Sequence, residues 1–484
     1  MTEREKCAHL LRKFGLGVTE TELNECEKRG LKASIEWLID AQETSETFDL
    51  NPWSFAYDKP GEANMDTGRY SAWFALKLVT SMRPLEANMT LFWHNHFSVS
   101  GSKITFGPMM VDHVELLRSH ALGNFRILLG EVSRDPAMIR WLDTDTNIKG
   151  RPNENFAREL LELFTLGVGN YTEKDIQEVT RAFTGWSVRA ALTETRGLTA
   201  DAQLKLAIRD ERPIVVFTDC PALHDRKEKK ILGRSGNFEA DDVLDLLVSH
   251  PAHARFLMRK LWSYFVYPDP DPKLIDRLAK VYTDAKFEMK VVLRWIANSK
   301  EFWSEKAQRS VVKSPAHYTF AFLRQLGVRE ILATANLNVV RDLAPVDSRI
   351  VQLARSIAQL TRRQGMTLMF PPDVAGWEWG NAWITTASVI ERNRLADVLL
   401  RNGSGFPAAL VSRFSARPPA TPDEAVSRLI EWFDVPANDE ARKIMAMAFE
   451  QNGGLAALSK AQSLSKAVSS VMRLATSLPE FQMN

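Results

Sequence analysis

Two of the nine histidines of this chain, His94 and His96, lie one residue apart in the segment Phe92-Trp-His-Asn-His-Phe97. An imidazole can act as an acid, a base or a metal ligand near neutral pH. If the preceding helix ends near Trp93, alternate residues of the extended chain point the same way and both histidines face one site. If the helix continues, the two rings lie about 200° apart and only one can serve. The segment therefore predicts either a metal site, with the Trp93 ring against a bound cofactor, or a core histidine bonded to a carbonyl.

Carboxylates and one guanidinium share a face of the helix that apolar spacing predicts over residues 153–166. In a regular α-helix, Glu154, Arg158 and Glu162 line up along this face. Glu159 lies beside them. We expect Glu154 to bind a metal and Glu159 or Glu162 to act as the general base. Arg158 would then neutralise developing negative charge. The alternative is a solvated face held by ordinary ion pairs between residues four apart.

A third candidate is the pair His224 and Asp225, predicted to lie in a turn. A histidine beside an aspartate on a loop is a candidate acid–base or ligand pair, so His224 is assigned to a metal and Asp225 to catalysis. Two imidazoles with one or two carboxylates form a ligand set that suits zinc, manganese or non-haem iron. The sequence thus favours a site for a divalent metal ion, with ligands that come from distant segments of the chain.

Three tryptophans follow one another closely in the segment Phe370–Trp383. Pro371 and Pro372 force an extended entry, and the glycines that follow allow tight turns. The Trp377 ring offers a flat surface that could stack on a sugar or another planar ligand. The alternative is that these rings only fill the space between helices.

Helices must position all of these groups, because helical periodicity dominates the chain. Predicted helices cover residues 3–14, 19–29, 31–41, 71–82, 84–96, 112–119, 124–133, 135–142, 153–166, 172–184, 239–249, 251–266, 272–282, 287–298, 314–326, 346–361, 386–402, 422–433, 438–449 and 454–476. Pro213–Thr218 and Lys229–Leu232 look extended and are expected to pair. The predicted fold is all-α, a large multi-helix assembly with one minor β-ribbon near residues 213–232.

The length of 484 residues favours more than one packed unit, since single cores rarely grow beyond ~250–300 residues. Residues 187–212 are charged and weakly patterned, and residues 403–421 are rich in glycine and proline. We therefore expect a main helical domain at 1–402, which contains the site and the insertion near 187–212. A C-terminal helical unit at 422–484 packs on it.

Composition excludes several classes of protein. Lys and Arg number 62 against 60 Asp and Glu, interleaved with them, so no nucleic-acid partner is expected. The three cysteines form no CxxC pair, which excludes a thiolate-rich metal site. No apolar run approaches the ~18 residues of a membrane span. The N-terminus lacks the apolar stretch of a signal peptide, which predicts a cytoplasmic protein, or a periplasmic or secreted one if the chain is a trimmed mature form.

The motifs together resemble the bacterial domain-of-unknown-function family 1800. The resemblance rests on Trp93-His-Asn-His-Phe97, Asp135-Pro-Ala-Met138, Pro152–Gly167, Phe183-Thr-Gly-Trp186, His224-Asp225, His250-Pro251 and Pro372-Asp-Val-Ala-Gly-Trp377, and on the opening Ala8–Gly17. It covers roughly residues 5–480. The family has no generally established activity, so the resemblance implies no catalytic residues. It does imply frequent secretion, which the missing signal peptide puts in doubt here.

The leading hypothesis is an enzyme with a His/carboxylate site that carries out metal-dependent hydrolysis or transfer on a polar substrate, either a small molecule or a carbohydrate-like one. One alternative is a redox enzyme that holds haem or non-haem iron among the aromatic side chains. The other is a non-catalytic helical module for binding or assembly with a protein partner, in which the polar clusters only specify the fold.

Overall fold

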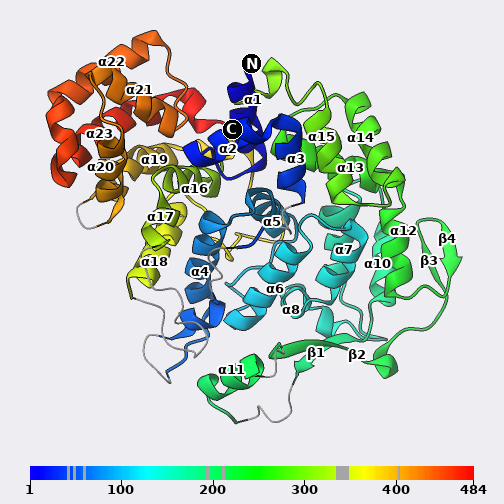
Figure 1. Cartoon of the computed structure of the whole chain (residues 1–484). Coiled ribbons are helices and arrows are strands. Elements are labelled where there is room, and N and C mark those ends of the chain that lie inside the picture. Colours follow the sequence, from blue (N-terminus) through cyan, green and yellow to red (C-terminus); the bar gives the residue numbers. More distant parts are fainter. Residues whose placement is uncertain are drawn as a thin grey trace.

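The computed structural model of the chain describes residues 1–40, 44–46, 51–57, 62–191, 197–209, 213–333, 348–401 and 404–484. Within these ranges helices form most of the regular structure, together with two small antiparallel ribbons (Figure 1). The predicted all-α fold with a minor β component is confirmed.

The helices follow one another through short loops, and many begin with a capping side chain or with proline in the first turn. In the N-terminal half they are α1 (Glu3–Phe14), α2 (Glu20–Arg29), α3 (Leu31–Ile39), α4 (Thr67–Thr80), α5 (Pro84–His96), α6 (Gly107–Ser119), α7 (Phe125–Arg134), α8 (Pro136–Trp141), α9 (Asn155–Glu159), α10 (Glu173–Ala182) and α11 (Ala200–Arg209). In the C-terminal half they are α12 (Ala240–Val248), α13 (Pro251–Phe265), α14 (Pro272–Asp284), α15 (Met289–Asn298), α16 (Pro315–Gln325), α17 (Val328–Ala333), α18 (Ser348–Arg363), α19 (Thr386–Leu399), α20 (Phe406–Ala416), α21 (Pro422–Trp432), α22 (Asp439–Gln451) and α23 (Ala461–Ser477).

Helix α5 lies in the middle of the molecule and is buried along its whole length (Figure 1). It begins with Pro84, whose fixed φ suits a first helical turn. It ends after His96, where the Phe97 N–H donates to the Trp93 carbonyl. Its bounds match the predicted helix at 84–96. Because α1, α3 and α6 pack around it, its polar side chains must find partners inside the protein.

The predicted glutamate-rich helix changes its winding halfway. Helix α9 is followed by a π-helical turn at Leu160–Thr165. A π turn adds one residue to the helical repeat, so the side chains after it rotate away from the line expected for a regular α-helix. The carbonyls of Phe164 and Thr165 accept hydrogen bonds from His96 Nε2 and His253 Nδ1, each at 3.1 Å.

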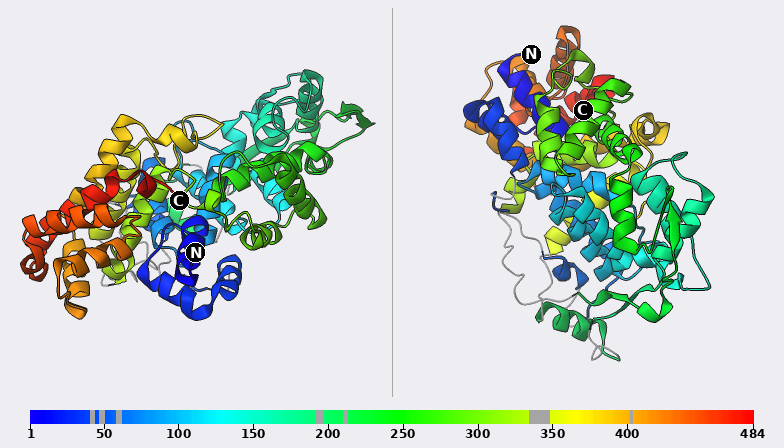
Figure 2. Two further views of the ribbon diagram at one scale, coloured as in Figure 1. Left: turned by 90° about the horizontal axis from the view of Figure 1, so that it is seen from above. Right: turned by 90° about the vertical axis from the view of Figure 1, so that its right-hand side faces the viewer.

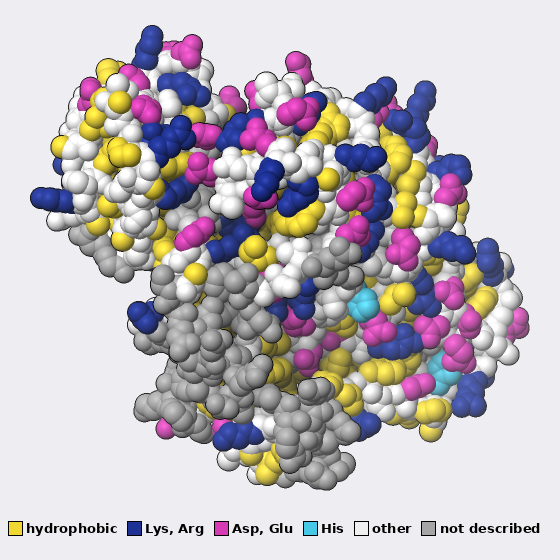
Figure 3. All heavy atoms as spheres, in the orientation of Figure 1, with side chains coloured by type: hydrophobic (Ala, Val, Ile, Leu, Met, Phe, Trp, Pro, Cys, Tyr) yellow, Lys and Arg dark blue, Asp and Glu magenta, His cyan; other side chains and the backbone are white. Residues whose placement is uncertain are grey.

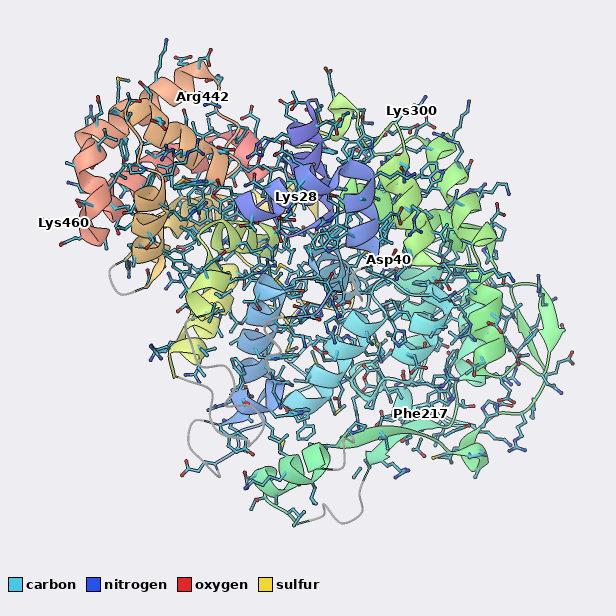
Figure 4. All side chains as sticks on the ribbon, in the orientation of Figure 1. Lys28, Asp40, Phe217, Lys300, Arg442 and Lys460 are labelled. Carbon is cyan, nitrogen blue, oxygen red and sulfur yellow. The ribbon has the colours of Figure 1, made fainter. Side chains whose placement is uncertain are left out.

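The single predicted ribbon is wrong in its pairing. The described part of the chain contains strands β1 (Trp186–Ala190), β2 (Val215–Asp219), β3 (Lys229–Ile231) and β4 (Arg234–Gly236). Strand β2 pairs with β1, and β3 pairs with β4. The turn between β3 and β4 has positive φ at Leu232 (47°) and Gly233 (79°), the geometry of a tight two-residue hairpin, so this strand closes on its nearest neighbour. Strand β2 pairs with β1 instead, and Val188 of β1 lies opposite Phe217 of β2. Phe217 is labelled in Figure 4.

Parts of five predicted segments lie outside the described residues. These parts are residue 41 of the helix expected at 31–41, residues 192–196 and 210–212 of the expected insertion, residues 346 and 347 of the helix expected at 346–361, residue 402 of the helix expected at 386–402, and Gly403 of the expected joint. The described part of the insertion contains most of β1 and helix α11.

The C-terminal helices α20 to α23 pack on one another and, through α23, on α19. Figure 2 shows them at one end of the molecule, with the β3–β4 ribbon at the other. The division into units at 1–402 and 422–484 stays a prediction. No helix in the described ranges is both long and apolar enough to cross a membrane. On the face drawn in Figure 3, basic side chains lie among acidic ones, as the balanced composition predicts.

Candidate functional site

His94 is fully buried and fixes a strained loop instead of facing its neighbour His96. Since α5 continues through His96, the two rings leave the helix on different sides. Nε2 of His94 accepts the N–H of Met369 at 3.0 Å, and Met369 has a positive φ of 63°. The proton of the neutral ring is therefore on Nδ1. Burial lowers the pKa of His94 to about 3, so the ring stays neutral.

His96 lies among aromatic rings on the other side. Its Nε2 donates to the Phe164 carbonyl, so its Nδ1 carries the lone pair, and Lys260 Nζ lies 3.0 Å from that atom. The ring of Trp93 packs against His96 and donates from Nε1 to the Ala121 carbonyl at 3.0 Å. Trp93 is thus a core side chain in this structure, without a free face for a ligand.

Only part of the predicted glutamate-rich face is present: Arg158 contacts Glu154 as expected, but Glu162 lies elsewhere. Arg158 pairs with Glu154 at 3.3 Å and with Glu173 at 2.8 Å, on the exposed side of α9. Glu162 leaves this line because of the π turn and accepts a hydrogen bond from the Tyr171 hydroxyl at 2.7 Å. Glu159 is half-buried, and burial followed by the charge of Glu162 raises its pKa.

His224 and Asp225 are held by partners of their own. His224 Nδ1 donates to the Thr184 carbonyl at 2.9 Å, and its Nε2 lies 3.0 Å from a carboxylate oxygen of Glu239. Asp225 accepts from the Arg181 guanidinium at 2.9 Å, which lowers the pKa of that carboxyl to about 2. A carboxylate with so low a pKa is a poor general base at neutral pH.

The predicted metal ligands therefore do not meet. His94, His96, Glu154 and His224 have separate sets of partners. Among the described residues there is no group of three or more His, Cys, Asp or Glu side chains arranged to hold a metal ion.

The tryptophan-rich loop covers the C-terminal turn of α5. Asn95 and Trp377 form a reciprocal pair: the Trp377 N–H donates to Asn95 Oδ1 at 2.6 Å, and Asn95 Nδ2 donates to the Trp377 carbonyl at 3.2 Å. A Cβ at Gly376 would lie only 2.4 Å from Asn95 Oδ1, so this close approach requires glycine. The loop is thereby fixed over α5, with Trp377 and Trp383 buried and Trp379 exposed by 42%.

A small pocket lies beneath this loop, between α5, α13 and the first turn of α16. Its lining includes Leu91, Asn95, Tyr264, Ser314, His317, Met366, Trp377, Glu378, Trp379 and Trp383. Its free space is about 10 Å³, roughly the room that one water molecule needs. The Trp379 ring stands edge-on against Tyr264, with ring centres 4.9 Å apart.

Four polar side chains form a connected chain, and three of them, Tyr264, Ser314 and His317, line this pocket. Ser314 Oγ lies 2.7 Å from His317 Nδ1, and His317 Nε2 lies 2.9 Å from Asn88 Oδ1. The Tyr264 hydroxyl donates to the same Asn88 oxygen at 2.6 Å. Ser314, His317 and Asn88 are all buried.

The protonation of this chain follows from Asn88. Its Nδ2 donates to the carbonyls of residues 13, 14 and 15 at 3.1–3.3 Å, so its Oδ1 must be the acceptor for its other partners. His317 then carries its proton on Nε2, and its Nδ1 accepts a hydrogen bond from the Ser314 hydroxyl. Burial, followed by the charge of Lys313, lowers the pKa of His317 to about 4, so the ring is neutral near pH 7 and its Nδ1 lone pair is available to the Ser314 hydroxyl.

Sequence reasoning included Trp377 in a site but did not identify Asn88, Tyr264, Ser314 or His317. The last two carry a visible signal, because Ser314-Pro-Ala-His317 begins a helix with serine as its N-cap and histidine three residues on. Asn88 and Tyr264 have no such signal. They meet the other two only through contacts between segments far apart in the chain.

Comparison with known proteins agrees with the resemblance seen in the motifs. No curated protein and no solved structure matches the chain. The sequence model of one family, described as "Protein of unknown function (DUF1800)", matches residues 9–483. The chain belongs to this family of proteins of unknown function.

Proposed function

We propose that the protein is an acyl hydrolase or acyltransferase in which Ser314 is the nucleophile, His317 the general base and Asn88 the residue that orients the imidazole. The observation that supports this proposal is the contact of 2.7 Å between Ser314 Oγ and His317 Nδ1, continued by the contact from His317 Nε2 to Asn88. A nucleophile, a base and an orienting group in hydrogen-bond contact are the general requirement for this chemistry.

The reaction proceeds in two balanced steps. Ser314 Oγ forms a bond to the carbonyl carbon of an ester, and its proton passes to His317 Nδ1. The leaving alcohol takes that proton as the ester C–O bond breaks. Water or another acceptor then gives a proton to His317 and attacks the carbonyl carbon of the acyl-serine, and His317 returns that proton to Ser314 Oγ as the acyl C–O bond breaks. While His317 is positively charged, the Asn88 oxygen stabilises the imidazolium through Nε2–H.

The surroundings support the same roles. Ser314 caps α16, whose first-turn N–H groups place partial positive charge near the oxygen that becomes negative. The tryptophan rings exclude water from the pocket and offer flat apolar surfaces to an acyl chain or planar leaving group. Because the free space is only about 10 Å³, a substrate must displace Trp379. Gly380, with a φ of 64° and open space around it, gives the chain beside Trp379 the freedom to move.

This proposal keeps the hydrolysis or transfer expected from the sequence but assigns it to other residues. A metal-dependent reaction at His94, His96, Glu154 and His224 stays a separate proposal. Metal analysis of the purified protein tests it, because stoichiometric zinc, manganese or iron that is lost in His94→Ala would favour it.

The serine proposal is tested with a fluorophosphonate probe and with p-nitrophenyl acetate. We expect covalent labelling of Ser314, located by peptide mass spectrometry, and ester hydrolysis that falls at least about 1,000-fold in Ser314→Ala and His317→Ala. Thr421→Ala is the matched control, because it removes another N-cap, on α21, without touching the pocket. It should lose about 1 kcal/mol of stability and keep full labelling. Wild-type protein that is neither labelled nor faster than Ser314→Ala would overturn the proposal.

A further inference from the structure

Lys260 is a half-buried cation that has no counter-ion among the residues that the structure describes. It lies on α13 one helical turn before Tyr264, which lines the pocket under the tryptophan loop, so the two side chains share a face of that helix. Its Nζ lies 3.0 Å from His96 Nδ1 and 5.2 Å from the centre of the Phe256 ring. Within the described ranges no carboxylate approaches Lys260 closely enough to form an ion pair.

His96 cannot act as the missing anion. Its Nε2–H is committed to the Phe164 carbonyl, so its Nδ1 is a neutral acceptor. The aromatic ring of Phe256 attracts the ammonium group but does not neutralise it. Two other half-buried lysines do form ion pairs with carboxylates. Lys77 pairs with Glu115 at 2.9 Å, and Lys290 pairs with Asp40 at 3.1 Å.

A cation held away from water without an anionic partner destabilises a protein, which a functional role can offset. Burial lowers the pKa of Lys260 to about 8, which still leaves most of the ammonium charged at pH 7. A charged donor with one neutral acceptor retains N–H groups for an incoming anion.

We infer that Lys260 binds an anionic group, a carboxylate or a phosphate, carried by the substrate of the neighbouring pocket. The identity of the ligand as a substrate rests on the proposed function. The binding of an anion at Lys260 does not. Because Lys260 precedes Tyr264 on the same helix face, an acyl group at Ser314 and an anionic end at Lys260 would lie along one side of α13.

The binding step is tested with inorganic phosphate and with succinate at constant ionic strength. Each lysine is acetylated with a water-soluble N-hydroxysuccinimide ester, and the rate is measured by peptide mass spectrometry. We expect one of the two anions to slow the acetylation of Lys260 and to leave Lys300 unchanged, since Lys300 is exposed at the surface (Figure 4). Protection by phosphate alone identifies a phosphate ligand, and protection by succinate a carboxylate. Equal rates with and without both anions would overturn the inference.

A stability measurement separates ligand binding from a structural role. Because Lys260→Met removes an unpaired charge, we expect it to raise the urea midpoint of the ligand-free protein. A structural lysine would give the opposite result, and a lower midpoint for Lys260→Met together with unprotected acetylation would leave the inference without support.

Enzyme kinetics then compare KM for the anionic ester mono-p-nitrophenyl succinate with KM for p-nitrophenyl acetate. In Lys260→Gln we expect KM for the anionic ester to rise about tenfold, the loss of one charge-assisted hydrogen bond, and KM for the acetate to stay the same. Lys260→Arg should restore most of the difference. If neither ester is hydrolysed but an anion still protects Lys260, the proposed function fails and the anion site stands. If both esters respond equally to Lys260→Gln, the anion site fails and the proposed function stands.

Discussion

The face around Arg158 and the network beneath the tryptophan loop contain similar chemical groups in opposite surroundings. The side chains of Arg158 and Glu173 are 38% and 71% exposed, and they neutralise each other. Ser314 and His317 are exposed by only 5% and 8%, and every contact in their network joins neutral groups. Charged groups on a solvated helix face find partners on the same surface, whereas the neutral groups under the loop direct their O–H and N–H donors at one another's lone pairs.

This difference shows why the number of charged residues is a poor guide to a site. A carboxylate or guanidinium at the surface interacts weakly with its partner, because water screens the pair. A neutral imidazole in a buried network has a fixed tautomer and a fixed direction for proton transfer. Glu159 lies between these extremes, with a pKa raised by burial and by Glu162.

The largest expected effect is loss of stability in acid. Burial lowers the pKa of His9 and His94 to about 3 and that of His253 and His317 to about 4. These values lie below the ~6.5 of a free histidine, so the folded protein binds fewer protons than the unfolded chain in this range. The stability that these groups contribute is complete above pH ~6.5 and falls as the pH decreases toward 4. Between pH 7 and pH 5 we expect a loss on the order of 5 kcal/mol, measured by urea unfolding.

His253→Asn is the control for this pH dependence. It removes one buried titrating ring away from the pocket, so the slope of unfolding free energy against pH should become shallower. An unchanged slope in this variant, or equal stability of the wild type at pH 7 and pH 5, would contradict the assignment of acid lability to buried neutral histidines.

The second effect concerns Asn88, on which the pocket network depends. Asn88→Ala removes the side-chain partner of three backbone carbonyls and of the His317 Nε2–H, while the Tyr264 hydroxyl keeps the Asn88 backbone carbonyl at 3.1 Å. We expect a loss of about 3 kcal/mol in the free energy of unfolding, since each unsatisfied buried group costs ~1–3 kcal/mol and some of these groups will relax. Urea unfolding at pH 7.5 measures it.

The matched control is Asn170→Ala. The Asn170 Nδ2 also donates to three backbone carbonyls, those of residues 166, 167 and 168, but the residue is exposed and water replaces it. Its removal should change stability far less than that of Asn88. Equal losses in the two variants would show that burial does not distinguish these sites.

The sequence predicts features that neighbouring residues determine, but it does not predict contacts between segments that are far apart in the chain. The start of α5 follows from Pro84 and the apolar pattern after it, so it could be predicted. The π turn after Glu159 could not, because the same apolar spacing also fits a regular helix. Asn88 and Tyr264 are 176 residues apart, and no periodicity shows that they will touch. The metal set proposed from His94 and His96 depended on where α5 ends, which the sequence left open.

The smallest effect is expected at Arg158, the residue expected from the sequence to neutralise developing negative charge. Hydrogen bonding to Glu173 raises the pKa of the Arg158 guanidinium, yet the pair is exposed. An exposed ion pair gains little over its two hydrated charges and orders two long side chains. Arg158→Ala should therefore leave the urea midpoint unchanged at low and at high salt, and should keep full labelling of Ser314. A large loss of labelling in this variant, with an unchanged midpoint, would give the exposed face a role in the reaction. The difference between the two regions would then reflect two parts of one site.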